Sequence, residues 1–348
     1  MIPKDKIISV LHPNVNKKWW AVNMMIYLSN LLKKENSVEF YTFSYDENLF
    51  SDSVTFKVNC LSKLQIAYSI RNSDFIIIWN SPMHFVWVLS KLIFFSKAKL
   101  IWWHHHYPWY YGKDTNVYIW IKRLLERASI LFIDEVISNS FYLQSSLKDI
   151  FGIESKILHP ILDRDFTKVA YNEIDFTSKT IFTYGRWVEW KNLNQVFLTY
   201  DMLKGQVDWL KLNIWWVGEE LDFFKDKYRD DLNVSFLWLL DNMSIIDNLQ
   251  KSLVCLFPSK IDSFWMTIIE AMSIGVPVVA FDINGSREII QDWQNWFLVN
   301  SDSEFTRKVL DILSDSELHK TLSINCLDIK LRFSEANFKK SLKDIFYS

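Results

Sequence analysis

Glycine and cysteine are both scarce in this sequence. The 348 residues include 7 glycines and 3 cysteines, whereas average usage of about 7% would give roughly 24 glycines. Cys60, Cys255 and Cys326 are odd in number, widely spaced and free of any C-x-x-C pair. This pattern argues against a disulfide framework and a zinc site, and it favours a reducing compartment.

Long uncharged hydrophobic segments are absent as well. The most apolar stretch, residues 85–103, is interrupted by Lys91, Lys97 and Lys99, whereas a helix that spans a bilayer needs about 20 nearly uncharged residues. We therefore expect a helix followed by a strand in this stretch. Residues 1–14 contain no long apolar signal-peptide segment, so the sequence predicts a soluble, cytoplasmic protein.

Charge of one sign is not in excess either. The formal net charge is −2, so nothing indicates a nucleic-acid partner. Hydrophobic residues make up 49% of the chain and charged residues 23%, which is typical of a globular protein. The length suits two domains of about 150 to 180 residues, each able to bury its own core.

Short apolar runs alternate with longer amphipathic stretches along the chain. Strands are expected at 7–11, 38–43, 75–78, 99–103, 135–138, 156–158, 180–184, 211–215, 234–237, 253–257 and 277–281. Helices are expected at 21–34, 117–128, 193–203, 245–251 and 264–274. Such alternation predicts βαβ units, and therefore an α/β fold of two Rossmann-like domains with parallel sheets.

The expected strands fall into two sets, separated by a polar and unpatterned segment. We predict a first domain at residues 1–163, a linker at 164–179 and a second domain at 180–325. Residues 326–348 are expected to form a C-terminal helix that packs back toward the first domain. Ligands of such sheets bind at the carboxyl ends of the strands, so the two sheets should face one another across a cleft.

A pair of cations follows the first strand of the second set. This strand ends in Gly185-Arg186, and Lys191 comes shortly afterwards. At a turn from strand to helix, both side chains can reach a diphosphate above the next helix, the arginine as a planar fork and the lysine as a point charge. Two solvated cations on a loop would give the same pattern, so both interpretations stay open.

An acidic motif lies further along the chain. It runs from Asp262 to Glu270 and continues as EAMSIGVPVVA. Together with Arg186 and Lys191, this motif resembles family 4 of the glycosyltransferases, whose second domain carries G-R-x4-K and, later, Glu-x7-Glu. Asp262 stands at the position of the earlier acid and is one methylene shorter than the family's glutamate.

The resemblance implies a GT-B fold and sugar transfer from a nucleotide-diphosphate donor with retention of anomeric configuration. It also implies that the domain at 1–163 lies on the acceptor side and that the domain at 180–325 binds the nucleotide sugar. Arg186 and Lys191 would bind the donor diphosphate, Glu270 would hold the ribose hydroxyls, and Asp262 would lie near the transferred sugar. A carboxylate suits a ribose because it can accept two hydroxyl hydrogen bonds. No metal or other cofactor is expected, because the two cations neutralise the diphosphate. The alternative for Glu270 is a helix acid that faces solvent.

The first half resembles the family more loosely. Asn139-Ser140 and a P-x-x-D stretch ending at Asp163 are similar to the end of the family's acceptor domain. A histidine beside the donor sugar is often found there as H-x-P, and His106 fits this spacing. His104 would share a face with His106 in an extended segment and is the second choice. Consecutive histidines cannot all converge on one metal ion without a sharp bend, so a metal site is not favoured.

Tryptophan, in contrast to glycine, is abundant, with 17 copies. Seven tryptophans stand where the family pattern has glycine, namely Trp19, Trp20, Trp216, Trp238, Trp265, Trp293 and Trp296, and Trp190 is placed with them. At Trp19, Trp20 and Trp265, a glycine backbone would approach the donor diphosphate closely. We hypothesise that some of these codons encode glycine, as in bacteria that decode UGA as glycine. The alternative is an aromatic-rich sugar-binding surface.

The sequence therefore predicts a retaining hexosyltransferase, with a weak preference for mannosyl transfer, that moves sugar from a nucleotide-sugar donor to a glycan or lipid-linked acceptor. Two alternatives stay open: a non-hydrolysing nucleotide-sugar 2-epimerase, and an inactive sugar-binding protein of the same fold.

Two stretches of the sequence combine apolar residues with lysines. One is an apolar helix flanked by Lys17, Lys18, Lys33 and Lys34, and the other is residues 85–103. Both suggest peripheral contact with the inner face of a membrane, although ordinary amphipathic helices would look the same.

Overall fold

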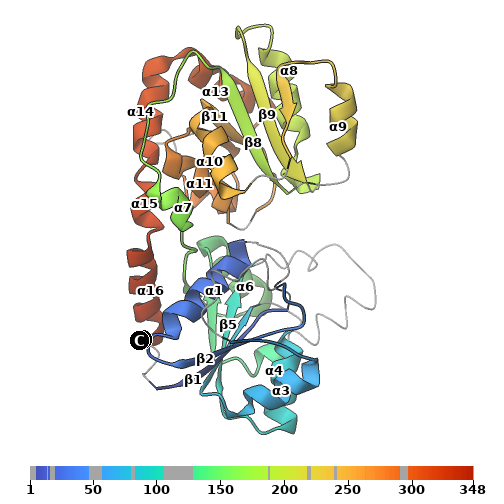
Figure 1. The fold of residues 1–348 in the computed structure, drawn as a ribbon, viewed down its shortest axis with the longest axis vertical. Coiled ribbons are helices and arrows are strands. Elements are labelled where there is room, and N and C mark those ends of the chain that lie inside the picture. Colours follow the sequence, from blue (N-terminus) through green and yellow to red (C-terminus); the bar gives the residue numbers. More distant parts are fainter. Residues whose placement is uncertain are drawn as a thin grey trace. The chain divides into compact units, whose positions relative to one another are not determined.

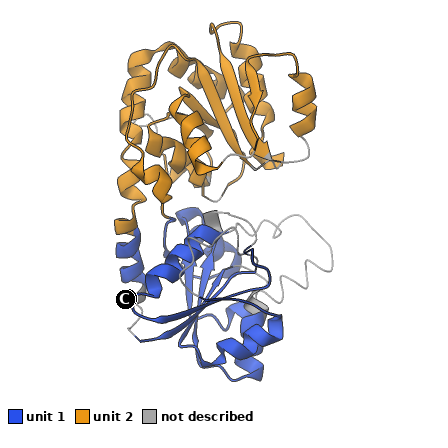
Figure 2. Ribbon diagram, viewed as in Figure 1, with its two compact units in different colours: residues 1–160, 338–348 blue, residues 161–337 orange. Residues whose placement is uncertain are grey.

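The computed structural model forms two compact units. It describes residues 5–13, 15, 20–46, 57–79, 83–105, 128–186, 189–217, 221–238, 241–262, 264–290 and 297–347. Unit 1 comprises residues 1–160 and 338–348, and unit 2 comprises residues 161–337 (Figure 2). Each unit is described by itself below.

Unit 1 is built on a seven-stranded sheet in the order β3-β2-β1-β4-β5-β6-β7, and all of its strand pairs are parallel (Figure 1). Its strands are β1 (Ile7–Leu11), β2 (Ser37–Thr42), β3 (Lys57–Cys60), β4 (Phe75–Trp79), β5 (Lys99–His104), β6 (Glu135–Ser138) and β7 (Lys156–Ile157). Strands β1, β4 and β5 are rich in buried Ile, Leu and Trp, as expected of a parallel sheet covered on both faces.

The described helices of unit 1 connect these strands. They are α1 (Trp20–Leu32), α3 (Lys63–Ser69), the 3-10 helix η1 (Ile70–Asn72), α4 (Met83–Ile93) and α6 (Phe141–Phe151). Helices α3 and α4 bury Ile66, Ala67 and Trp87 in one core cluster with Ile76 and Leu100 of the sheet. The apolar stretch at 85–103 thus forms a helix followed by a strand, as predicted from its lysines.

Unit 2 is built on a six-stranded parallel sheet in the order β10-β9-β8-β11-β12-β13 (Figure 1). Its strands are β8 (Thr180–Arg186), β9 (Lys211–Val217), β10 (Val234–Phe236), β11 (Val254–Phe257), β12 (Val278–Phe281) and β13 (Phe297–Val299). Its helices are α7 (Arg164–Lys168), η2 (Glu189–Lys191), α8 (Asn194–Leu203), α9 (Leu221–Lys227), α10 (Asn242–Gln250), α11 (Met266–Ile274), α12 (Asn284–Arg287), α13 (Asp302–Ser314), α14 (Ser316–Cys326) and α15 (Ile329–Arg332).

The last helix, α16 (Glu335–Tyr347), begins in unit 2 and continues into unit 1. Within unit 1 its Phe338 ring lies 5.7 Å from the ring of Tyr27, and the Lys156 ammonium donates to the Ile345 carbonyl oxygen at 3.0 Å. These contacts attach the end of the chain to α1 and β7.

In each sheet, successive strands are added first toward one edge and then toward the other, so the strand order reverses once. In unit 1 the reversal falls between β1 and β4, and in unit 2 it falls between β8 and β11. The connections that leave two such neighbouring strands run to opposite sides, so their carboxyl ends stay uncovered and form the usual ligand-binding position of an open α/β sheet. The residues that follow β8 and β11 are therefore the first place to look for a site.

The predicted fold class is confirmed, because both units are α/β with parallel sheets. Strands β3 and β13 were not anticipated, and α7 occupies the first part of the predicted linker at 164–179. The expected helix at 117–128 lies almost wholly outside the described residues. No helix in the described ranges is long and apolar enough to cross a bilayer.

The turn before β9 contains a strained residue. Trp209 has φ 58 and is 83% exposed, so its indole contributes little packing in a conformation that favours glycine. We expect Trp209→Gly to be about 0.5–1 kcal/mol more stable than Trp209→Ala, because both remove the ring but only glycine relieves the left-handed backbone. Urea unfolding of the two variants measures the difference. Equal or lower stability of the glycine variant would show that this turn is unstrained.

Candidate active site

The site lies after the carboxyl ends of β8 and β11. Gly185, near the end of β8, has φ 153, and the ring of Trp216 on β9 lies 3.5 Å from the position that a Cβ would take. The indole is 4% exposed and donates from Nε1 to the Thr183 hydroxyl at 3.1 Å. The ring leaves room for a Cβ at ordinary contact distance, so it is the φ of 153 that favours glycine at position 185.

Lys191 and Asp262 form an ion pair that joins the two loops. Lys191 ends η2, and the turn is completed by Asn192, whose φ of 53 is one that asparagine tolerates. The two side chains are only 25% and 19% exposed. A backbone hydrogen bond of 2.9 Å from Lys260 N to the Trp190 carbonyl oxygen holds the same loops together. The cation predicted to bind phosphate is therefore positioned by the acid predicted to lie near the sugar.

The indole of Trp265 packs beside Lys191. It occupies the N-cap position of α11, is 2% exposed, and its ring centroid lies 5.0 Å from Lys191 Nζ and 5.8 Å from that of Phe257. The ring is thus close enough for a cation–π contact with the lysine. Among the described residues, its buried Nε1–H has no hydrogen-bond acceptor.

Glu270 lies further along α11 and contacts the end of β8. The buried Tyr184 hydroxyl lies 3.0 Å from Glu270 Oε2 and 2.9 Å from the Thr267 carbonyl oxygen, with its proton available to both. Burial raises the pKa of Glu270 to about 7, and the negative charge of Asp163 adds to this, while the bond from Tyr184 acts in the opposite direction. Burial and the Glu270 charge raise the pKa of Tyr184 well above its usual range.

The structure thus brings together Lys191, Asp262 and Trp265, and places Glu270 on the helix that Trp265 caps. Arg186 ends β8, but its side chain lies outside the described part. Trp20 begins α1, again without a described side chain. Trp19 and His106 lie outside the described residues altogether.

In unit 1, aromatic side chains pack at the carboxyl ends of β4 and β5. His105 stacks on Trp79 with a centroid distance of 3.4 Å and an interplanar angle of 14°. His104 is 6% exposed and its ring lies 4.6 Å from that of Trp102. Of the residues that resemble the end of the acceptor domain, Ser140 caps α6, and Asp163 caps α7 by accepting from Asp165 N at 2.9 Å.

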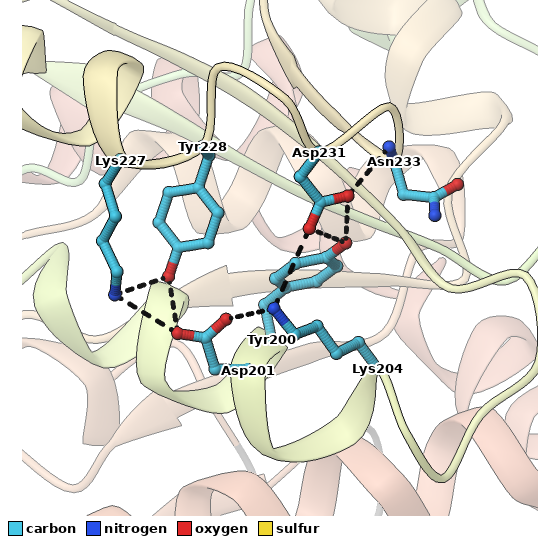
Figure 3. A network of polar contacts seen from close by, with 7 residues as sticks. All are labelled: Tyr200, Asp201, Lys204, Lys227, Tyr228, Asp231 and Asn233. Carbon is cyan, nitrogen blue, oxygen red and sulfur yellow. Dashed lines mark hydrogen bonds and ion pairs between the residues drawn. The ribbon is translucent and has the colours of Figure 1, made fainter.

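A second polar network lies in unit 2 where α8 and α9 end and the chain enters β10 (Figure 3). The Tyr228 hydroxyl donates to Asp201 at 2.7 Å, and the Tyr200 hydroxyl donates to Asp231 at 3.0 Å. Lys204 lies within ion-pair distance of both acids, at 2.8 and 3.9 Å. These contacts tie the end of α8 to the turn before β10, so we regard the network as structural. The described residues contain no group of three or more side chains suited to holding a metal ion.

Comparison with known sequences matches the second half of the chain to a family. Residues 166–326 match the family described as glycosyl transferases group 1. An uncharacterized glycosyltransferase of Methanocaldococcus jannaschii is 23% identical over 352 residues, covering 94% of this chain and 95% of that protein. A poly(glycerol-phosphate) alpha-glucosyltransferase of Bacillus subtilis is 23% identical over 159 residues, covering 44% of this chain and 23% of that protein.

Solved structures match both units. HepE of Anabaena in complex with UDP has a TM-score of 0.78 at 16% identity, over 97% of this chain and 98% of that chain. Sucrose-phosphate synthase of Thermosynechococcus elongatus has a TM-score of 0.76 at 14% identity, over 98% of both chains. The two parallel-sheet units therefore have the GT-B fold.

Residues 166–326 therefore form a group 1 glycosyltransferase domain. The protein is thus an enzyme that transfers a sugar from a nucleotide-sugar donor. Neither the family match nor the buried, packed indoles of Trp216 and Trp265 support the hypothesis that tryptophan codons are misread.

Sequence reasoning missed that Tyr184 and Asp163 act on Glu270. Tyr184 directly precedes Gly185-Arg186, and a phenol at a strand end beside a phosphate motif was the available signal. Asp163 raises the pKa of Glu270 although it is far away in the sequence. Its proximity depends on how α7 packs against α11, which no local pattern reveals.

The raised pKa of Glu270 predicts how stability depends on pH. Between 4.5 and about 7 the folded protein keeps a proton that the unfolded chain releases. The free energy of unfolding should therefore be highest below this window and fall across it by roughly 3 kcal/mol as pH rises. Glu270→Gln keeps an acceptor for Tyr184 but cannot titrate, so this part of the fall should vanish. Urea unfolding at several pH values provides the test, and identical profiles for both proteins would contradict it.

Proposed function

We propose that this protein is a retaining hexosyltransferase that uses a UDP-sugar and a glycan or lipid-linked acceptor, with peripheral contact at a membrane surface. The observation that carries the proposal is the gathering of Lys191, Asp262 and Trp265 after β8 and β11. A compact cation lies there beside the N-terminus of α11, where backbone N–H groups add to the attraction for a diphosphate.

In this proposal the reaction depends on electrostatic stabilisation of the leaving group. As the bond between the sugar and the diphosphate breaks, negative charge grows on the phosphate oxygens. Lys191 and Arg186 neutralise that charge without the need for a metal ion, and the partial burial of Lys191 strengthens the interaction. The sugar then has oxocarbenium character, as in glycoside hydrolysis. His106 would position a donor hydroxyl, and the acceptor would bind in unit 1.

Glu270 is proposed to hold the ribose of the donor. Its carboxylate form can accept two hydroxyl hydrogen bonds. The hydrogen bond from Tyr184 fixes the orientation of the carboxyl group. With a pKa near 7, ribose binding would favour the ionised form and should strengthen as pH rises through neutrality.

Asp262 is proposed to have two successive partners. Without donor it pairs with Lys191. When a diphosphate arrives, the lysine exchanges this carboxylate for phosphate oxygens, which releases Asp262 toward the hydroxyls of the sugar. The same acid would thus hold the cation in place before binding and position the sugar afterwards.

The preference for a UDP-sugar is drawn from the solved relatives. HepE of Anabaena was also solved in complex with UDP-glucose. The similarity to mannosyl-type motifs at Asn139-Ser140 favours a mannosyl donor instead. Glucose and mannose are both hexoses, so the proposal is stated as hexosyl transfer. A panel of UDP-glucose, UDP-N-acetylglucosamine and GDP-mannose, with release of the nucleotide as the readout, tests the choice. Epimerisation of a donor in the absence of acceptor would overturn the transferase proposal in favour of a 2-epimerase.

Removal of either cation should slow the transfer. We expect Lys191→Ala and Arg186→Ala each to lower kcat/KM by about 100-fold or more, because each removes charge stabilisation that grows in the transition state. The rate of nucleotide release from the donor measures this effect. Lys251→Ala is a matched control, since Lys251 pairs with Asp247 on the surface of α10. Near-normal rates in both site variants would remove the basis for the assignment.

If Lys191 exchanges Asp262 for phosphate, substitution of Asp262 should strengthen the binding of UDP but slow the transfer of sugar. Asp262→Asn removes the carboxylate that competes with phosphate, so we expect UDP to bind about tenfold more tightly. Transfer should nevertheless slow, because the amide holds the sugar hydroxyls less strongly than a carboxylate. Calorimetry with UDP and turnover with the donor separate the two effects. Weaker UDP binding in this variant would show that Asp262 supports the diphosphate site rather than competing with it.

A further inference from the structure

Helices α3 and α4 of unit 1 carry exposed apolar side chains on their outer side. We call this the α3–α4 surface, and it consists of Leu64, Tyr68, Leu92, Ile93 and Phe95. Each of these side chains is at least half exposed, and Phe95 is 82% exposed. The inner sides of the same helices already fill the core through Ile66 and Trp87, so the outer side chains are not required for the fold.

An aromatic contact links the two helices near these side chains. The two helices lie side by side (Figure 1). The ring of Tyr68 on α3 lies 5.4 Å from that of Phe94, which follows α4. The Arg71 guanidinium lies 3.5 Å above the ring of Tyr68. Tyr68 therefore contacts both the end of α4 and a cation, so exposed apolar side chains of the two helices meet at this point.

Basic residues outnumber acidic ones in this part of the chain. Residues 57–99 contain six Lys or Arg and a single acid, Asp74, in a chain whose formal net charge is −2. Asp74 is within ion-pair distance of Lys6, at 3.5 Å. The nearby Asp134 accepts a hydrogen bond from Leu100 N at 2.7 Å. Lys63 is exposed next to Leu64 in the sequence, and Lys97 is exposed two residues after Phe95.

Phe95 occupies a conformation that disfavours it. The residue has φ 55, and Ser96 N bonds the Ser90 carbonyl oxygen at 3.2 Å. This is the position after a helix where glycine is most common, because a side chain there strains the left-handed backbone. An exposed phenyl ring at this position costs stability and contributes little packing. Such strain, retained on a surface, points to a role for the ring outside the fold.

We propose that the α3–α4 surface docks on an anionic lipid bilayer. Phe95, Ile93 and Leu92 would enter the boundary between headgroups and acyl chains, while Lys63 and Lys97 would contact lipid phosphates. Apolar side chains surrounded by lysines are the composition of segments that lie in a membrane interface. The inference deepens the proposed membrane contact, but it concerns unit 1 and needs no sugar donor.

Binding to vesicles tests the proposal. The full chain should cosediment with vesicles of phosphatidylglycerol and phosphatidylcholine, and less with pure phosphatidylcholine or at high salt. Phe95→Gly should weaken binding about tenfold by removing the inserted ring, while thermal stability stays the same or rises. Lys63→Gln combined with Lys97→Gln should weaken binding about 25-fold, at roughly fivefold for each charge.

The chain contains a matched control for the loss of the ring. Trp209→Gly also removes an exposed aromatic side chain from a left-handed position, but in unit 2. It should leave vesicle binding unchanged. Equal binding by Phe95→Gly and the original chain, or equal binding to neutral vesicles, would overturn the proposal. So would a self-association in solution that Phe95→Gly abolishes, because a second copy would then be the partner. Calorimetry with UDP, which reports on unit 2 alone, separates these outcomes from a failure of the proposed transfer reaction.

Discussion

The ion pair between Lys191 and Asp262 is the interaction on which the candidate site depends. It joins the loop after β8 to the loop after β11, which neighbour one another where the strand order reverses. Parallel strands with helical crossovers leave this position open, so polar side chains can collect there without cost to the core. Because both groups are largely shielded from water, neither would be stable there alone. The pair thus keeps a cation ready for an anionic ligand.

Much of the fold could be predicted from the sequence, because buried parallel strands are nearly continuous apolar runs. The bounds of β1 and β6 match the expectation, and β8 begins where predicted. Strand β3 was missed because it is short, lies at the edge of the sheet and contains the polar residues Lys57 and Asn59, so it forms no continuous apolar run. The pairing of Lys191 with Asp262 follows from strand order rather than from either motif. Tyr184 and Asp163 act on Glu270 through tertiary packing, so sequence patterns could supply the acid but not its raised pKa.

The tryptophans show that alignment with a family pattern does not reveal whether a position needs glycine. Trp216 and Trp265 stand where glycine was expected, yet both are buried, and Trp216 packs over Gly185 with its Nε1–H bonded to Thr183. The position that needs glycine here is Gly185, because of its φ of 153, and the indole packs against it at ordinary contact distance. Trp209, which no motif singled out, has the positive φ that favours glycine. Backbone conformation, rather than alignment, identifies the position where an indole is strained.

Phe95 and Trp209 show that the same strain can have different meanings. Both are exposed aromatic residues with left-handed backbones, at φ 55 and φ 58. Phe95 follows the exposed Leu92 and Ile93 and is followed by the exposed Lys97. Trp209, in contrast, lies between the exposed Asp208 and Lys211, and its neighbour Leu210 is buried. The charges beside Trp209 therefore cancel, whereas the residues nearest Phe95 in the sequence combine apolar side chains with a positive charge. This difference is the reason that the proposed docking surface includes Phe95 and not Trp209.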